Sequence, residues 1–129
     1  MQIIYALSIR SYYLMIRLAA LWNRKAALWI KGRKNWRTSL RKRFDQKDRV
    51  IWFHCSSLGE FEQGRPLMET VRKEYPEFKI LLTFFSPSGY DKRKDYPVAD
   101  HVCYLPLDTA RNARDFIGAL PLHSVFFIK

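Results

Sequence analysis

The sequence has little cysteine and no uninterrupted apolar run long enough to cross a bilayer. Its two cysteines, Cys55 and Cys103, show neither a CxxC spacing nor a Cys/His ligand pattern, so neither a zinc site nor a disulfide framework is indicated. We therefore expect a reducing compartment. Arg10 and Arg17 divide the apolar N-terminus into stretches shorter than the roughly 18 residues that a spanning helix requires. The same arginines, and the absence of a small-residue cleavage site, argue against a secretory signal peptide.

Acidic residues are also scarce, but only at the N-terminal end. Residues 1–50 hold 13 lysines and arginines and only two acidic residues, whereas residues 51–129 hold 10 of each sign. The whole net charge of +11 therefore lies in the first fifty residues. This division predicts a basic, membrane-associating segment, residues 1–49, attached to one neutral globular domain, residues 50–129. It does not indicate a uniformly basic nucleic-acid-binding protein, and we expect no nucleic-acid partner.

The basic segment is predicted to form an amphipathic helix. Cations recur every seven residues, at Arg10, Arg17, Arg24 and Lys31, a spacing that keeps them on one helical face. Tryptophan, tyrosine and aliphatic residues occupy the positions between them. This composition is typical of a helix in a bilayer interface with its cations toward anionic lipid, so an anionic membrane surface is the predicted partner. A helix packed against its own domain is the alternative.

From residue 50 onward, four short apolar runs alternate with polar helical stretches. Residues 50–54, 79–85, 101–105 and 124–128 are each predicted to form a buried strand. Helices are predicted over residues 59–74, from Ser86-Pro87 through Lys94, and from an N-cap at Asp108 to Gly118. This alternation predicts an α/β fold: a Rossmann-like parallel sheet with flanking helices, preceded by the basic amphipathic N-terminal helix.

The loop after His54 is where we look for chemistry. If the strand order is 3-2-1-4, the order reverses between the first strand and the fourth, and ligands bind beyond the carboxyl ends of the strands at that point. The loop contains neither GxGxxG nor GxxxxGK[ST], so dinucleotide and nucleoside triphosphate binding lack their usual sequence support. It contains serine hydroxyls at Ser56 and Ser57, a glycine at Gly59 that lets a ligand approach the backbone, and the carboxylate of Glu60.

Two of these side chains have competing interpretations. Glu60 has the position of a general base toward a hydroxyl, but Ser57-x-x-Glu60 also matches a helix capping box. His54 is either an orienting hydrogen-bonding group or a proton shuttle. It cannot form a dyad with Cys55, because adjacent residues on a strand point to opposite faces.

The next strand-to-helix junction offers a second group of polar residues. Ser86, Ser88 and Gly89 lie where free backbone N–H groups favour an anion. Helix capping by the same serines is the alternative explanation.

These residues resemble a known family. His54 followed by Ser57, Gly59 and Glu60 is similar to the HxxSxGE motif of the 3-deoxy-D-manno-octulosonic acid (Kdo) transferases. Further segments match the family in the same order and spacing: Pro66-Leu67, Arg72, Tyr75-Pro76, Thr83, Ser86-Pro87-Ser88-Gly89, Tyr104-Leu105-Pro106-Leu107-Asp108 and the terminal Val125-Phe126-Phe127-Ile128-Lys129. The resemblance covers essentially the whole chain.

The resemblance implies a GT-B glycosyltransferase of lipopolysaccharide biosynthesis, with two Rossmann-like lobes facing across a cleft. This chain would be the N-terminal lobe that binds the acceptor, a lipid A precursor, while CMP-Kdo binds mainly to the C-terminal lobe. Transfer would proceed with inversion and without a metal or other cofactor. The protein would work at the cytoplasmic face of the inner membrane, as a peripheral or N-terminally anchored enzyme. Because the sequence ends at Lys129, before the donor lobe, we expect the chain alone to be inactive.

The resemblance also assigns roles to residues of this chain. Glu60 is implied to be the catalytic base that deprotonates the acceptor hydroxyl. The implied substrate-binding residues are His54, Ser56, Ser57, Gly59, Ser86, Ser88 and Gly89. Two other functions compete with this assignment: a non-enzymatic, membrane-docked flavodoxin-like binding module, and a GT-B transferase with a different acceptor.

Overall fold

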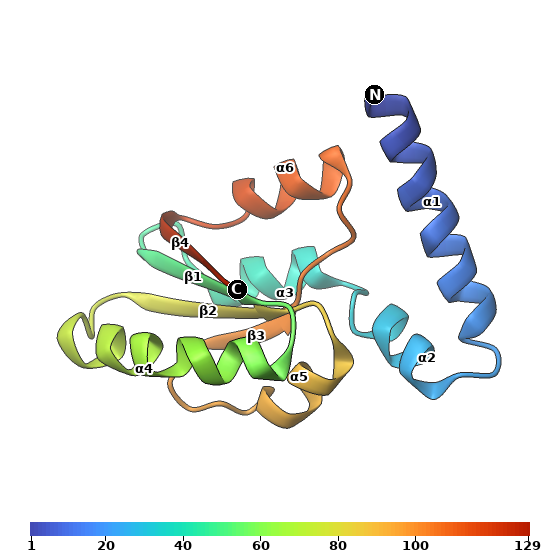
Figure 1. The fold of residues 1–129 in the computed structure, drawn as a ribbon. Coiled ribbons are helices and arrows are strands. Elements are labelled where there is room, and N and C mark those ends of the chain that lie inside the picture. The colour runs from blue at the N-terminus through green and yellow to red at the C-terminus, as the bar shows by residue number, and fades with distance from the viewer.

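A computed structural model describes residues 1–129 as a helical N-terminal segment followed by an α/β unit (Figure 1). The elements in chain order are α1 (Gln2–Ala19), α2 (Arg24–Lys31), α3 (Trp36–Arg43), β1 (Val50–Cys55), α4 (Leu58–Glu74), β2 (Lys79–Phe84), α5 (Pro87–Arg93), β3 (His101–Tyr104), α6 (Ala110–Gly118) and β4 (Leu122–Ile128). The α/β fold class predicted from the alternating pattern is confirmed.

The sheet has four parallel strands in the order β3-β2-β1-β4, as predicted. The central strand β1 pairs with β2 on one side and with β4 on the other, with Trp52 opposite Leu81 and Val125. All six residues of β1 are buried. The chain therefore moves outward from β1 to β3 and then crosses back to the other side of β1, which puts the reversal of strand order between β1 and β4.

Helices cover both faces of the sheet (Figure 1). Alternate residues of β1 belong to the two different core clusters, because successive side chains of a strand point to opposite faces. On one face, Phe53 packs in a core with Phe61 and Met68 of α4. On the other, Trp52 packs with Phe116 of α6 and with residues of α3. The two apolar clusters account for the burial of β1 and β2, whereas two of the four residues of the edge strand β3 are buried.

Helix α3 belongs to the core of the α/β unit. Its residues Trp36 and Leu40 are buried, and Phe44, directly after the helix, is also buried against the sheet. These residues were predicted to belong to the basic segment that ends at residue 49. Globular packing thus starts further toward the N-terminus than predicted, because the apolar residues of α3 recur at a spacing of four that lets them share one face of the helix.

The N-terminal helix is present, but it is not continuous through Lys31. Helix α1 ends at Ala19, and Asn23 is extended at φ −122°, where its side-chain oxygen accepts hydrogen bonds from the backbone N–H groups of Lys25 and Ala26. This asparagine cap starts a new helix and divides the predicted stripe of cations between α1 and α2. The prediction of one cationic face across residues 10–31 is therefore wrong.

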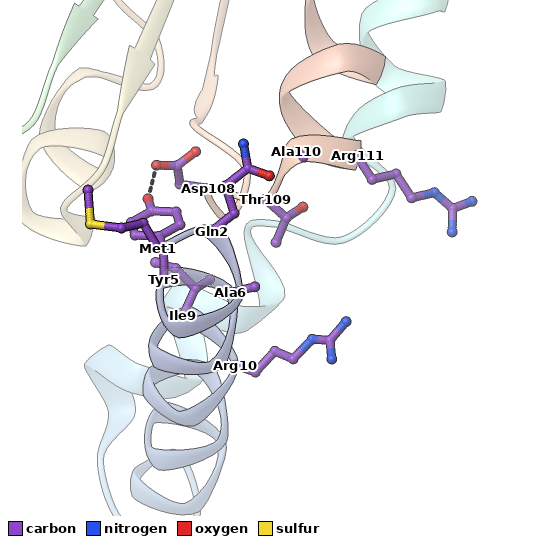
Figure 2. Close-up of a pocket in the computed structure, with 10 residues that line it drawn as sticks. All are labelled: Met1, Gln2, Tyr5, Ala6, Ile9, Arg10, Asp108, Thr109, Ala110 and Arg111. Carbon is purple, nitrogen blue, oxygen red and sulfur yellow. Dashed lines mark hydrogen bonds between the residues drawn. The ribbon is translucent and has the colours of Figure 1, made fainter.

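Helix α1 stands away from the sheet and buries none of its residues (Figure 1). Tyr12 and Tyr13 contact the ring of Trp29 on α2, and near its start Tyr5 donates a hydrogen bond to the carboxylate of Asp108 (Figure 2). No helix of the chain combines the length and the apolar character needed to span a membrane.

Two smaller predictions are corrected at the C-terminal end. The cap of α6 is Thr109, whose hydroxyl accepts from the N–H of Asn112 at 3.2 Å, and not Asp108, whose carboxylate is bonded to Tyr5. Strand β4 was predicted to be buried, but it is an edge strand with half-exposed side chains, and Phe127 is 56% exposed. Only one of its two edges pairs with another strand.

Candidate functional site

The carboxyl ends of β1 and β2 bring the two predicted loops together. The backbone N–H of Ser86, after β2, donates to the carbonyl oxygen of Ser56, after β1, at 2.9 Å. Both loops therefore lie at the carboxyl ends of the strands. The loop after β1 borders the reversal of strand order between β1 and β4, which is the place predicted for ligand binding. The roles of the individual residues as substrate contacts stay predictions.

Glu60 forms the capping box that its spacing predicts. The Ser57 hydroxyl accepts from the Glu60 N–H at 3.4 Å, and the Glu60 carboxylate oxygen Oε2 accepts from the N–H groups of Ser56 and Ser57. The second carboxylate oxygen, Oε1, forms no hydrogen bond within the chain. One oxygen thus caps α4 while the other stays available, so the capping and general-base interpretations of Glu60 are compatible.

His54 lies in a buried hydrogen-bonded cluster. Its Nδ1 is 2.9 Å from the hydroxyl oxygen of Thr83, which also accepts from the indole N–H of Trp52 at 2.8 Å. The ring of Phe127 packs edge-on against the imidazole. Burial lowers the pKa of His54, which keeps the ring neutral near pH 7, and the neighbouring Glu60 carboxylate partly opposes that shift. Nε2 forms no hydrogen bond within the chain and is the ring nitrogen left for a ligand.

The residues after β2 cap α5 and close the site on one side. The Ser86 hydroxyl accepts from the N–H of Ser88 at 3.3 Å, and the two serine hydroxyls lie 2.8 Å apart. Gly89 is buried, and a Cβ there would come within 2.5 Å of the Phe84 ring and 3.3 Å of the Leu58 nitrogen. This glycine is required for α5 to pack against the end of β2.

Gly59 differs from Gly89, because a side chain at this position would not clash with the rest of the chain. The nearest atom to a Cβ at this position would be the Ser57 hydroxyl oxygen at 3.9 Å. The space beside its backbone is open, as a ligand-approach role requires.

Arg33 was not among the predicted site residues, but it follows α2 and lies beside the loop after β2. Its guanidinium donates to the carbonyl oxygens of Trp29 at 3.1 Å and Phe85 at 2.9 Å. It lies 3.7 Å from the centre of the Trp29 ring and 4.9 Å from that of Tyr104. Burial lowers the pKa of Arg33 to about 10. The preceding glycine, Gly32, was the only local sequence signal for this position. In the structure, a Cβ at Gly32 would lie 2.1 Å from the Tyr104 ring.

An apolar groove adjoins the predicted residues. It has a volume of about 440 Å³ and lies between the sheet edge and α6, with Trp52, Phe85, Phe116 and Phe127 among its walls. Trp52 and Phe127 are the residues that contact the Thr83–His54 pair. Its volume is within the range of about 300–1,000 Å³ that is usual for small-molecule sites.

A larger cleft of about 780 Å³ separates α1 from the start of α6 (Figure 2). Tyr5 and Asp108 join across it, while Arg10 and Arg111 extend outward from its rim (Figure 2). None of the predicted site residues lines this cleft, so we do not place the chemistry there. It meets the apolar groove at Asp108, which lines both.

The arrangement suits acid-base chemistry on a hydroxyl. A carboxylate with one free oxygen and a neutral imidazole with one free nitrogen lie at the same sheet edge, beside an apolar groove. A neutral imidazole can donate or accept a hydrogen bond, and a carboxylate accepts a proton. No group of three or more His, Cys, Asp or Glu side chains is gathered in the chain to hold a metal ion.

Comparison with known proteins gives a consistent family. Residues 20–129 match the family model described as 3-Deoxy-D-manno-octulosonic-acid transferase (kdotransferase). A 3-deoxy-D-manno-octulosonic acid transferase of Aquifex aeolicus is 30% identical over 94 residues, which is 68% of this chain and 22% of that protein. The enzyme of the same name from Chlamydophila psittaci is 38% identical over 73 residues, 55% of this chain and 17% of its own length.

A third such transferase, from Chlamydia muridarum, is 31% identical over 80 residues, 60% of this chain and 19% of that protein. The chain thus spans about a fifth of the length of the curated relatives it matches. No solved structure matches it. Because the family model covers residues 20–129, including the whole α/β unit, the chain belongs to the 3-deoxy-D-manno-octulosonic-acid transferase family.

Proposed function

We propose that this chain is the acceptor-binding N-terminal lobe of an inverting GT-B glycosyltransferase that transfers Kdo from CMP-Kdo to a lipid A precursor. Glu60 is the general base of the transfer. His54, Ser56, Ser57, Gly59, Ser86, Ser88 and Gly89 surround the acceptor sugar. CMP-Kdo binds mainly to a second lobe. The curated relatives are long enough to contain such a lobe in addition to the part that matches this chain.

The observation that carries this proposal is the divided use of the Glu60 carboxylate. Oε2 accepts from two backbone N–H groups, which fixes the side chain at the start of α4, and Oε1 has no partner. A base must be held in place and must also keep a free oxygen for the proton. Glu60 satisfies both requirements at the point where the strand order reverses.

The proposed reaction forms one bond and breaks another. The acceptor hydroxyl oxygen attacks the anomeric carbon of Kdo from the face opposite the leaving group, and its proton passes to Oε1 of Glu60. The bond between the anomeric carbon and the CMP phosphate oxygen breaks, and its electrons leave with CMP. His54, neutral because burial lowers its pKa, offers Nε2 as a hydrogen-bonding partner for the acceptor sugar.

An acceptor that carries acyl chains fits the apolar surfaces of the chain. The groove beside His54 has eight hydrophobic residues among the ten that line it. Helix α1 exposes apolar residues along its length, and the net charge of the first fifty residues is strongly positive. We therefore propose a site of action at the cytoplasmic face of the inner membrane, with the N-terminal helices at the lipid surface.

The test is Glu60→Gln in the complete transferase, measured as the rate of Kdo transfer from CMP-Kdo. Glutamine preserves the size and much of the cap but removes the base, so transfer falls by about 10²–10⁴-fold while acceptor binding is retained. Glu74→Gln is the matched control, because Glu74 lies on the same helix, is exposed and forms no ion pair.

Ser57→Ala separates the two roles of the loop. It removes the N-cap hydroxyl and costs about 0.5–2 kcal/mol of stability without touching the base. If Glu60→Gln instead retains transfer within a few-fold of the parent and loses about as much stability as Ser57→Ala, then Glu60 is solely a helix cap.

A further inference from the structure

A small pocket lies between the N-terminal helices and the loop that follows β3. It has a volume of about 210 Å³ and is lined on one side by the turn that joins α2 to α3, and on the other by Leu107 and Asn112. Tyr13 of α1 and Trp36 of α3 form part of its walls. None of the residues assigned above to the transfer site lines it.

All the charged side chains that line the pocket are cationic. Arg33, Lys34 and Arg37 line the pocket, and no aspartate or glutamate does. Lys34 forms no ion pair in the chain. Arg37 is paired on one side with Asp115 and Asn112 through Nε and Nη2, and its Nη1 has no partner. Three cations therefore meet with only one carboxylate nearby, and that carboxylate lies outside the pocket.

The burial of Arg33 makes this excess of charge costly. Its Nε is inaccessible to solvent and has no hydrogen-bond partner. Aromatic rings and two carbonyl oxygens contact the guanidinium, but no carboxylate neutralises it. Buried charges in proteins are ordinarily paired, so an anion next to this group relieves an unfavourable arrangement.

The backbone beside the pocket adds further donors. Asn35 adopts φ 58°, a left-handed conformation, and begins α3 without a side-chain cap. The N–H groups of Trp36, Arg37 and Thr38 consequently have no acceptor in the chain. A cation, Arg37, also occupies the first turn of α3, where the helix dipole favours negative charge.

We propose that this pocket binds a phosphate group carried by an amphiphile, with Lys34, Arg33 and Arg37 as its ligands. A tetrahedral anion with several acceptor oxygens can accept hydrogen bonds from three neighbouring cations and from the free backbone N–H groups beside them. The pocket shares Leu107 with the apolar groove beside His54, so one ligand can place its phosphate in the pocket and an apolar part in the groove.

Two sources provide this chemistry: the phosphate of a glycolipid acceptor and the headgroup of a membrane phospholipid. Assignment to the acceptor rests on the proposed function, whereas the phosphate pocket itself does not. The experiments therefore measure binding to the chain first and transfer by the complete enzyme second.

The binding experiment is calorimetric titration of the chain with dihexanoyl phosphatidic acid, a soluble amphiphile with a terminal phosphate. Lys34→Gln weakens the Kd by about tenfold or more, as expected for loss of a charge-assisted hydrogen bond. Lys42→Gln removes the same charge from an exposed position of α3 outside the pocket and leaves the Kd within about twofold, because salt screens a solvated charge. Dihexanoyl phosphatidylcholine, which has no terminal phosphate, binds with no difference between the two variants.

Lys34 has no partner within the chain, so its substitution is expected to leave the fold intact, and a melting curve checks this. Equal Kd values for folded Lys34→Gln and Lys42→Gln overturn the proposal. Failure of the complete enzyme to transfer Kdo would refute the proposed function and leave this binding result unaffected.

The source is identified with acceptors that carry or lack their phosphate. If the pocket takes the acceptor phosphate, Lys34→Gln raises the KM for the phosphorylated acceptor about tenfold and leaves that for the dephosphorylated acceptor unchanged. If it takes a phospholipid, both KM values are unchanged and binding to phosphatidic acid vesicles falls. Both results support a phosphate pocket. Unchanged KM values together with unchanged vesicle binding contradict it.

Discussion

Replacing Thr83 by valine tests the buried cluster that holds His54. Thr83 is fully buried, and its hydroxyl oxygen accepts from the Trp52 indole N–H at 2.8 Å and lies 2.9 Å from Nδ1 of His54. Valine has nearly the same shape, so packing in the sheet is preserved while both nitrogens lose their partner. A buried polar group left unsatisfied costs about 1–3 kcal/mol, and we expect Thr83→Val to lose about 2–4 kcal/mol of unfolding free energy.

Urea unfolding followed by tryptophan fluorescence measures this loss. Thr83→Ser is the comparison, because serine retains the hydroxyl and removes only a methyl group, which costs about 1 kcal/mol. Thr83→Val is therefore expected to be less stable than Thr83→Ser, although valine preserves more of the apolar surface. The reverse order, or equal stability, would refute the argument that the threonine hydroxyl stabilises this part of the sheet.

Three further predictions concern folding stability. Burial lowers the pKa of His54 below its ordinary value of about 6.5. The unfolded chain therefore takes up a proton more readily than the folded one as the pH falls below that value, and the free energy of unfolding decreases. Between pH 7.5 and pH 5.5, the free energy of unfolding measured in urea should therefore change less for His54→Gln than for the exposed control His123→Gln. An equal change in the two variants would count against burial of His54 as the cause. Gly89→Ala places a methyl group 2.5 Å from a phenylalanine ring carbon and should lower stability by about 1–3 kcal/mol, whereas Gly59→Ala, whose nearest neighbour is at 3.9 Å, should melt at or above the parent temperature; similar melting of the two variants would contradict the packing assigned to α5. Leu40→Ala should cost about 2–5 kcal/mol because this residue of α3 is fully buried, and a loss below 1 kcal/mol would show that α3 lies outside the core.

The sequence by itself determined the α/β unit because its signals are local. Apolar runs of strand length alternate with helical stretches, and this order requires crossover connections, which predicted a parallel sheet with β1 beside β4. The capping box of Ser57 and Glu60 was also visible, since both partners lie within four residues of each other. Sequence spacing cannot show whether Glu60 also has a free oxygen. In the structure only Oε2 accepts hydrogen bonds, so Oε1 is free.

The tertiary structure decided the features that depend on contacts between distant residues. The burial of Leu40 joined α3 to the sheet. The division of the N-terminal helix is an exception, because the cap at Asn23 is a local signal that the seven-residue spacing of cations outweighed. Arg33 reaches Phe85 across 52 positions of sequence. In the sequence, Arg33 cannot be distinguished from the solvated cations around it. In the structure, aromatic rings surround its guanidinium. Local propensity specifies where helices and strands form, whereas the place of a side chain in a site depends on which distant surfaces come to share one edge of the sheet.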